Sequence, residues 1–136
     1  MDAYLDKARQ NMDAAKHLLQ QDSSLHIAAV HPAYYAVFQT VKYILDTQQI
    51  MDYATQDSKA GGSKSHKILI DEITKDVKKH HSNNCNNMCR HMSTVRLYRK
   101  KADYNNSPIS ENSINEFYSN IQDLFSDFDQ IYNVKI

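Results

Sequence analysis

Basic and aromatic side chains alternate between residues 96 and 104. Four cations fall within six positions, and tyrosines lie between and after them: Arg96, Arg99, Lys100, Lys101, Tyr98 and Tyr104. A guanidinium group can pair with a phosphate through two parallel hydrogen bonds, and aromatic rings can stack on bases. The pattern therefore predicts a small site for a nucleic acid or a nucleotide. The alternative is the solvated end of a helix, where the helix dipole favours cations.

Two pairs of residues have either a structural role or a role in binding a ligand. Arg99 and Asp103 stand four positions apart, which is the spacing of an ion pair on a helix surface. With the base before the acid such a pair would contribute only about 0.3 kcal/mol, and the alternative is that both side chains face a ligand. Tyr34 and Tyr35 either pack in the core with one hydroxyl hydrogen-bonded, or stack on a base.

A second group of reactive side chains lies within twelve residues: His80, His81, Cys85, Cys89 and His91. Two cysteines one helical turn apart have poor geometry for a disulfide, so reduced thiols are expected. With a histidine they could share a zinc ion, but the spacing fits no standard zinc finger. The alternative is a loop and helix start that are rich in histidine, and we predict no metal ion and no other cofactor.

The composition favours helices and a cytoplasmic protein. Only 2 glycines and 2 prolines occur in 136 residues, so few tight turns are expected. The 16 basic and 16 acidic residues balance, which argues against a broad surface that coats DNA. The first residues lack the apolar core of a signal peptide, and no apolar run approaches the roughly 20 residues of a membrane span.

Apolar side chains recur at the three- and four-residue spacing of helices. This spacing predicts helices over residues 2–21, 24–47, 65–80 and 86–104, and a last helix that Ser110 caps. Residues 48–64 are predicted to form a loop, and Pro32 should either kink the second helix or mark a late start to it. The second helix is apolar on more than one face, which predicts a central position. The expected fold is all-α: one domain, residues 1–136, in an up-and-down bundle of four long helices and a shorter one.

Three segments, taken in order along the chain, resemble the HEPN domain. They are Ala33–Phe38 (AYYAVF), Ser65–Lys67 (SHK) and Arg99–Tyr104 (RKKADY). The small stand-alone bacterial HEPN proteins carry a "YYA-x-F" stretch, a Ser-His at a helix start and an "Arg-x-x-Ala-Asp-Tyr" stretch in that order. The resemblance spans nearly the whole chain, and it implies a helical bundle that forms a homodimer.

The HEPN nucleases cut RNA without a metal ion, using an arginine, four to six intervening residues and then a histidine. Arg99 matches the arginine, but Tyr104 stands at the nearest histidine position, and no histidine lies in that window. Tyrosine is a poor general base because its reference pKa is about 10. His66 or His31 would substitute if either reached the same cleft. Small HEPN members often carry an arginine before "YYA", where this chain has Pro32.

The resemblance and the basic pattern together assign residues to one site. The catalytic candidates are Arg99, Asp103 and Tyr104, and the ligand-binding candidates are Arg96, Lys100, Lys101, His66, His31, Tyr34 and Tyr35. The leading hypothesis is a binding protein for RNA, a nucleotide or a partner protein. HEPN proteins often act beside a nucleotidyltransferase in toxin–antitoxin or phage-defence modules, and such a partner is expected for this chain. One alternative is a metal-independent endoribonuclease toxin with a rearranged site, and another is a structural dimer without a ligand.

Overall fold

The computed structural model describes residues 2–21, 27–59, 65–83, 85–104 and 110–136, with only the backbone described for Ser65, Asp103 and Tyr104. Within these ranges all regular structure is helical, which confirms the all-α class. The elements are α1 (Ala3–Leu19), a 3₁₀ turn (Ile27–Ala29), α2 (Val30–Thr47), α3 (Tyr53–Lys59), α4 (Ser65–His80), α5 (Cys85–Tyr104) and α6 (Glu111–Tyr132). In the same ranges, no helix combines the length and the apolar character needed to cross a bilayer.

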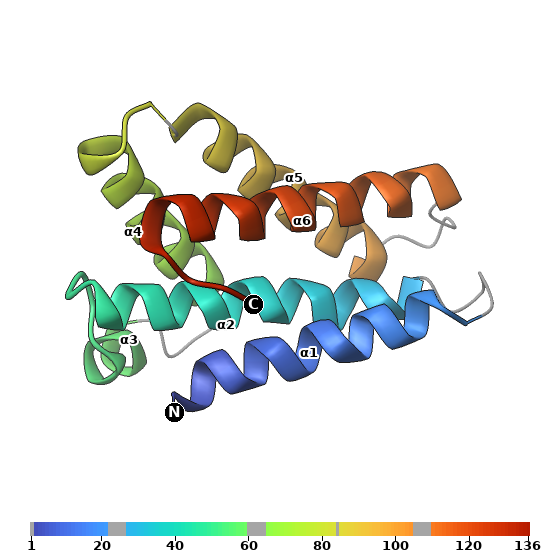
Figure 1. Ribbon diagram of the computed structural model, residues 1–136, viewed down its shortest axis with the longest axis horizontal. Coiled ribbons are helices and arrows are strands. Elements are labelled where there is room, and N and C mark those ends of the chain that lie inside the picture. Colours follow the sequence, from blue (N-terminus) through green and yellow to red (C-terminus); the bar gives the residue numbers. More distant parts are fainter. Residues whose placement is uncertain (1, 22–26, 60–64, 84, 105–109) are drawn as a thin grey trace.

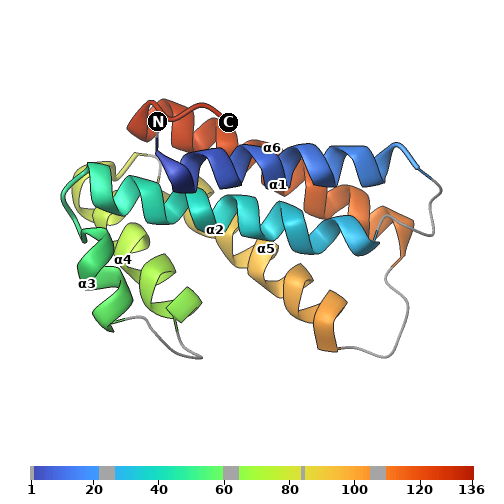
Figure 2. The ribbon, with the colours of Figure 1, turned by 90° about the horizontal axis from the view of Figure 1, so that it is seen from below.

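Helix α2 is the centre of the molecule. Helices α1 and α2 lie side by side and antiparallel, and α6 returns along them in the direction of α2 (Figure 1). Helices α4 and α5 form a hairpin that packs across α2 (Figure 2). The predicted central position of the second helix is confirmed, because α2 contacts α1, α3, α4, α5 and α6.

The core forms one cluster, to which α2 and α6 contribute the most buried side chains. Helix α6 buries the apolar stripe that its sequence predicts: Ile114, Phe117, Tyr118, Ile121, Leu124, Phe128 and Tyr132. Burying one large apolar side chain contributes about 1.5–3 kcal/mol. The predicted cap is also present, since the Ser110 hydroxyl accepts the Ser113 backbone N–H at 3.1 Å.

The predicted loop over residues 48–64 is wrong in part, because α3 lies within it. Two polar side chains hold this short helix. The Asp52 carboxylate accepts the Thr55 N–H at 2.8 Å. The side-chain amide of the buried Gln56 donates to the backbone carbonyls of Lys42 at 3.0 Å and Met51 at 2.9 Å. The structure thus has six α-helices in its described ranges, five of them long, where four long helices and a shorter one were expected.

Pro32 marks a late start of the second helix. Helix α2 begins at Val30 rather than at residue 24, and Pro32 lies in its first turn. Proline is tolerated there because the N–H it lacks would have no partner within the helix. Of the two predicted outcomes, a kink or a late start, the structure therefore has the late start.

Tyrosine hydroxyls donate hydrogen bonds to carboxylates of other helices, or of the residue that caps α1, at three places. The pairs are Tyr53–Asp2 at 2.8 Å, Tyr98–Glu116 at 2.6 Å and Tyr132–Asp76 at 2.7 Å. Burial and these bonds raise the pKa of Tyr53 and Tyr132, with burial the larger cause, whereas the Glu116 bond is the larger cause for the raised pKa of Tyr98. The three phenols therefore stay protonated and fix the positions of α3, α5 and α6 relative to their neighbours.

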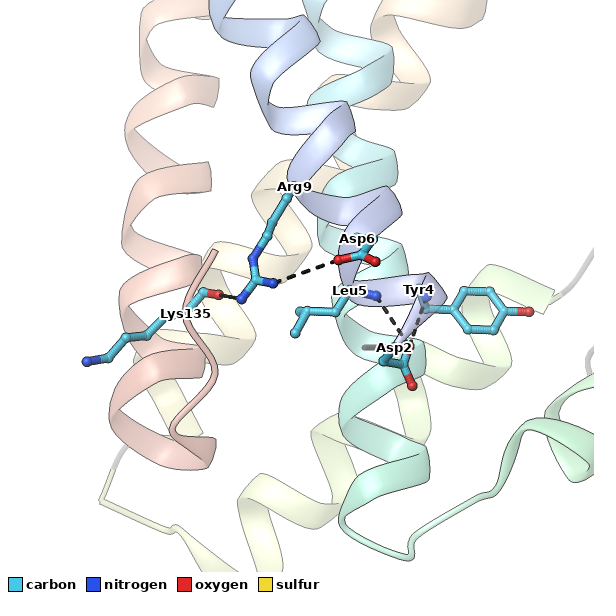
Figure 3. Close-up of polar contacts among 6 residues, drawn as sticks. All are labelled: Asp2, Tyr4, Leu5, Asp6, Arg9 and Lys135. Carbon is cyan, nitrogen blue, oxygen red and sulfur yellow. Dashed lines mark hydrogen bonds and ion pairs between the residues drawn. The ribbon is translucent and has the colours of Figure 1, made fainter.

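Asp2 caps the first turn of α1, and its side chain is expected to stabilise the fold (Figure 3). One of its carboxylate oxygens accepts the backbone N–H groups of Tyr4 at 2.8 Å and Leu5 at 3.4 Å, and the other accepts the Tyr53 hydroxyl. We expect Asp2→Ala to lower the free energy of unfolding by about 1–2 kcal/mol, and Asp2→Asn, which keeps a capping oxygen, to lower it less. Urea denaturation measures both variants. An Asp2→Ala protein as stable as the native chain would contradict this role.

Candidate functional site

The start of α2, the first turn of α4 and the second half of α5 meet on one side of the molecule. Helix α4 begins and α5 ends on the same side of α2 (Figure 2). We call the side chains gathered around His66 the His66 site: His31, Tyr34, Tyr35, Phe38 and Lys42 from α2, His66 from α4, and Arg96 and Arg99 from α5.

The imidazole of His66 is fixed by rings of α2. Its Nδ1 atom shares a hydrogen bond of 2.9 Å with the Tyr34 hydroxyl. The ring lies nearly parallel to that of Phe38, with centroids 4.0 Å apart and an interplanar angle of 14°. Tyr34 is also nearly parallel to it, at 5.5 Å and 12°. Because Nδ1 is taken by Tyr34, any ligand must be met by the other ring nitrogen, Nε2.

His66 is a neutral imidazole at pH 7. Burial and, after it, the positive charges of Arg99, Arg96, Lys42 and His31 lower its pKa to about 4. A neutral imidazole has two tautomers. If Nδ1–H donates to the Tyr34 oxygen, Nε2 keeps a lone pair and can accept a proton; if the Tyr34 hydroxyl donates to Nδ1, Nε2–H is a donor.

Arg99, which comes from α5, also contacts the Tyr34 ring. Its guanidinium carbon is 5.2 Å from the ring centroid, within the range of a cation–π contact. The side chain is partly buried, as is Arg96 one turn earlier. Stacking on an aromatic ring orients the planar guanidinium group, which favours paired hydrogen bonds to a phosphate.

Tyr34 and Tyr35 have different roles. Tyr34 is 2% exposed, so it is a core residue whose hydroxyl is hydrogen-bonded, the first of the two sequence interpretations. Tyr35 is only partly buried, and its ring centroid is 4.7 Å from that of the exposed His31. This accessible pair of rings lies at the edge of the cationic group, since Tyr35 also meets His66 edge-on at 5.9 Å.

The structure does not bring every predicted residue to His66. Lys100 and Lys101 are exposed, and the Lys101 ammonium lies 5.3 Å from the ring of Tyr98, which is bonded to α6. The side chains of Asp103 and Tyr104 lie outside the described residues, and so does the predicted pair of Arg99 with Asp103.

Phe38 and Lys42 also belong to the site, although their sequence context does not predict it. Phe38 fits the apolar pattern of a core residue, and Lys42 lies outside the three HEPN-like segments. A signal is nevertheless present, because both follow Tyr34 at intervals of four residues on one face of α2. Lys42 also lies 4.4 Å from the Tyr4 ring, a contact that connects the site to α1.

The histidines of residues 80–91 have separate partners. His80 lies 3.9 Å from Asp76, and His81 meets the ring of Tyr132. The buried His91 shares a hydrogen bond of 2.8 Å with Asp127 of α6. Burial, and next Cys85, raise the pKa of the Cys89 thiol, while Lys78 opposes the shift. In the described part of the chain, no three His, Cys, Asp or Glu side chains are grouped so that they could hold a metal ion.

The low pKa of His66 should make stability depend on pH. Between about pH 4 and 6.5 the unfolded chain binds a proton at His66 that the folded chain does not, so stability should rise with pH there and level off above 6.5. A proton NMR titration of His66 should give a midpoint near 4, and His66→Phe should flatten the rise. A midpoint at or above 6.5 would contradict the buried and electropositive environment of His66.

No protein-family model, curated protein or solved structure matches the chain significantly. The resemblance to the HEPN domain therefore stays a prediction that rests on the three sequence segments. A function for this chain has to be inferred from the geometry of the His66 site and from those segments.

Proposed function

We propose that this chain is a HEPN-like helical protein that binds RNA or a nucleotide through the His66 site. One observation carries the proposal: the three segments that resemble HEPN each contribute a side chain to one contact group. Tyr34, His66 and Arg99 come from the first, second and third segments, and Tyr34 touches both of the others. A helical bundle can form without contacts among these three segments. Their contact in one site therefore supports a common role in binding a ligand.

The ligand should carry phosphate and an accessible base. Arg96, Arg99 and Lys42 supply positive charge for phosphate oxygens. The accessible rings of His31 and Tyr35 offer a stacking surface for a base. A base inside a duplex cannot reach such a surface, so single strands or free nucleotides are favoured. The balanced net charge fits a local site of this kind better than an extended basic groove.

The test of binding is fluorescence anisotropy with a labelled single-stranded RNA of about ten nucleotides, in EDTA. Two or three phosphate contacts should give a slope of log K against log salt of about −1.4 to −2.1. A duplex of the same sequence should compete poorly. No saturable binding, or a duplex that competes as well as the single strand, would contradict the proposal and favour the structural dimer without a ligand.

A homodimer and a nucleotidyltransferase-type partner, in a toxin–antitoxin or defence module, complete the proposal. They follow from the HEPN resemblance. Leu97, on the outward side of α5 beside Arg96, is 52% exposed, and an apolar contact at this position would bury it. Light scattering of the purified chain gives its molar mass and so tests the dimer. Co-purification with the product of any neighbouring nucleotidyltransferase gene tests the partner. A monomer at all concentrations would contradict the dimer.

The second candidate function is a metal-independent endoribonuclease, and the position of His66 favours it. The HEPN nuclease motif lacks its histidine in this chain, yet His66 contacts the same Tyr34 ring as Arg99. As a neutral imidazole, its Nε2 can take the proton of a ribose 2′-hydroxyl that attacks the adjacent phosphorus. Arg99 would stabilise the phosphorane charge, and His31 would protonate the leaving 5′-oxygen. The products are a 2′,3′-cyclic phosphate and a 5′-hydroxyl end.

Cleavage is tested with a mixed RNA pool in excess EDTA, using the native chain, Arg99→Ala and His66→Asn. The second candidate predicts cyclic-phosphate ends from the native chain and their loss in both variants. Binding without cleavage would select the first candidate. Cleavage that survives both substitutions would place the reaction outside the His66 site.

A further inference from the structure

Positive charge in the His66 site is concentrated around one half-buried ring. The groups that face His66 are His31, Tyr34, Tyr35 and Lys42 from α2 and Arg96 and Arg99 from α5. The charges that contribute most to the lowered pKa of His66 are those of Arg99, Arg96, Lys42 and His31. In the unliganded site these charges oppose a further proton on the imidazole. A ligand that neutralises them would remove that opposition.

We propose that the site recognises the terminal phosphate of a nucleotide or RNA strand, a monoester, and that His66 takes up a proton when this phosphate binds. The inference rests on the proposed function and specifies its substrate class. A terminal phosphate carries nearly two negative charges at pH 7, because its second pKa is about 6, whereas an internal phosphodiester carries one. The dianion balances more of the charge supplied by Arg96, Arg99 and Lys42.

Two contacts of the His66 ring can stabilise an imidazolium ion once the neighbouring positive charges are neutralised. Once both ring nitrogens carry hydrogen, Nδ1–H donates to the Tyr34 oxygen 2.9 Å away, and Nε2–H becomes a donor for a phosphate oxygen. The Phe38 ring, parallel at 4.0 Å, presents its π face to the new charge. The heavy atoms of neither contact have to move, although the Tyr34 hydroxyl must act as the acceptor. Protonation then replaces the two tautomers of His66 by one state, which has a donor toward the ligand.

The proposal also gives a reason for the burial of His66. A fully exposed histidine would carry a charge at mildly acidic pH with or without a ligand, and would then attract any anion. Half-burial among cations keeps His66 neutral until a strongly charged anion arrives. The site then discriminates between ligands by their charge. An internal phosphate, with one negative charge, neutralises less of the positive charge around His66 than a terminal phosphate does.

The experiment uses one short single-stranded RNA sequence in three forms: 5′-phosphorylated, 3′-phosphorylated and without a terminal phosphate. Calorimetry at pH 7 in a phosphate-free buffer gives the affinities. In parallel, NMR follows the Cε1 proton of His66, whose shift reports the charge of that ring and not protons on the phosphate. Inorganic phosphate alone is a fourth arm, and His17→Asn, on the exposed side of α1, is the matched control for His66→Asn.

We expect at least one phosphorylated form to bind about tenfold more tightly than the unphosphorylated RNA, one extra charged hydrogen bond being enough for this. That form should also raise the His66 titration midpoint by about 1–3 pH units, from about 4 to about 5–7, as an adjacent opposite charge does, so proton uptake is partial at pH 7 and larger at pH 5–6. His66→Asn should lose most of this preference, keeping only the part that Arg96, Arg99 and Lys42 provide, and His17→Asn should keep it in full.

Equal affinity for the three forms, with no change at His66, would overturn the inference and leave the proposed RNA binding in place. Failure of all three forms to bind would remove the proposed function itself. A His66 shift with inorganic phosphate that the phosphorylated RNA does not enhance would overturn the inference too, since the site would then hold an anion without recognising a nucleic-acid end. These outcomes separate the failure of the inference from that of the proposed function.

Discussion

Replacing Arg99 by alanine should weaken the binding of single-stranded RNA by about 10- to 100-fold, because hydrogen bonds between charged groups contribute about 1.5–3 kcal/mol. The guanidinium group contacts the Tyr34 ring and lies close to His66 and Arg96, so its charge belongs to the proposed phosphate site. Arg99→Lys should lose an intermediate amount, since lysine keeps the charge but cannot form two parallel hydrogen bonds. Fluorescence anisotropy at one fixed salt concentration measures both variants.

Arg90 provides the matched control for this substitution. It is exposed on the same helix, and it precedes Arg99 by nine residues, or two and a half turns, which places it on the opposite side of α5. Arg90→Ala should leave the affinity within about twofold of the native value, because a lone surface charge contributes little. If Arg90→Ala and Arg99→Ala weakened binding equally, the interaction would be with the overall charge of α5 rather than with the His66 site.

Tyr34→Ala should lower the free energy of unfolding by about 3–5 kcal/mol, the usual cost of truncating a buried aromatic side chain. Tyr34 is 2% exposed and contacts both His66 of α4 and Arg99 of α5, so alanine would leave a cavity where three helices meet. Tyr34→Phe removes only the hydroxyl and should lose about 1 kcal/mol. Urea denaturation with tyrosine fluorescence or circular dichroism measures the difference.

The two Tyr34 variants separate the core role of this residue from its role in the site. Tyr34→Phe keeps the ring that stacks on His66 and supports Arg99, but it removes the hydrogen-bond partner of Nδ1. A folded Tyr34→Phe protein with weakened RNA binding is the expected result. If Tyr34→Ala were as stable as Tyr34→Phe, the burial of this ring in the core would be contradicted.

The parts of the fold that local patterns determine could be predicted from the sequence. Helix α6 carries an apolar stripe along its whole length and a capping serine, and both are present in the structure. Helix α3 could not be predicted because seven residues are too few for a strong periodic signal, and isolated helices of this length are not stable. What holds α3 is tertiary: the amide of Gln56 reaches a carbonyl of α2, and no local pattern reveals that bond.

Most residues of the candidate site could be predicted from the sequence, but Phe38, Lys42 and the arrangement of the site could not. Tyr34, His66 and Arg99 come from separate segments, and the 32 positions between Tyr34 and His66 hide their contact from sequence inspection. Lys100 and Lys101 follow Arg99 directly, but they are exposed and are not among the groups that lower the pKa of His66. Successive helical residues point in different directions, so a basic run cannot all face one ligand.

The location of binding on the molecule tests the central claim most directly. Amide NMR spectra of the isotope-labelled chain would be recorded while single-stranded RNA is added. We predict that the largest shift changes map to the first half of α2, the first turn of α4 and the second half of α5, with His66 and Arg99 among them. Changes confined to α1 and α6, or no changes at saturating RNA, would contradict binding at the His66 site.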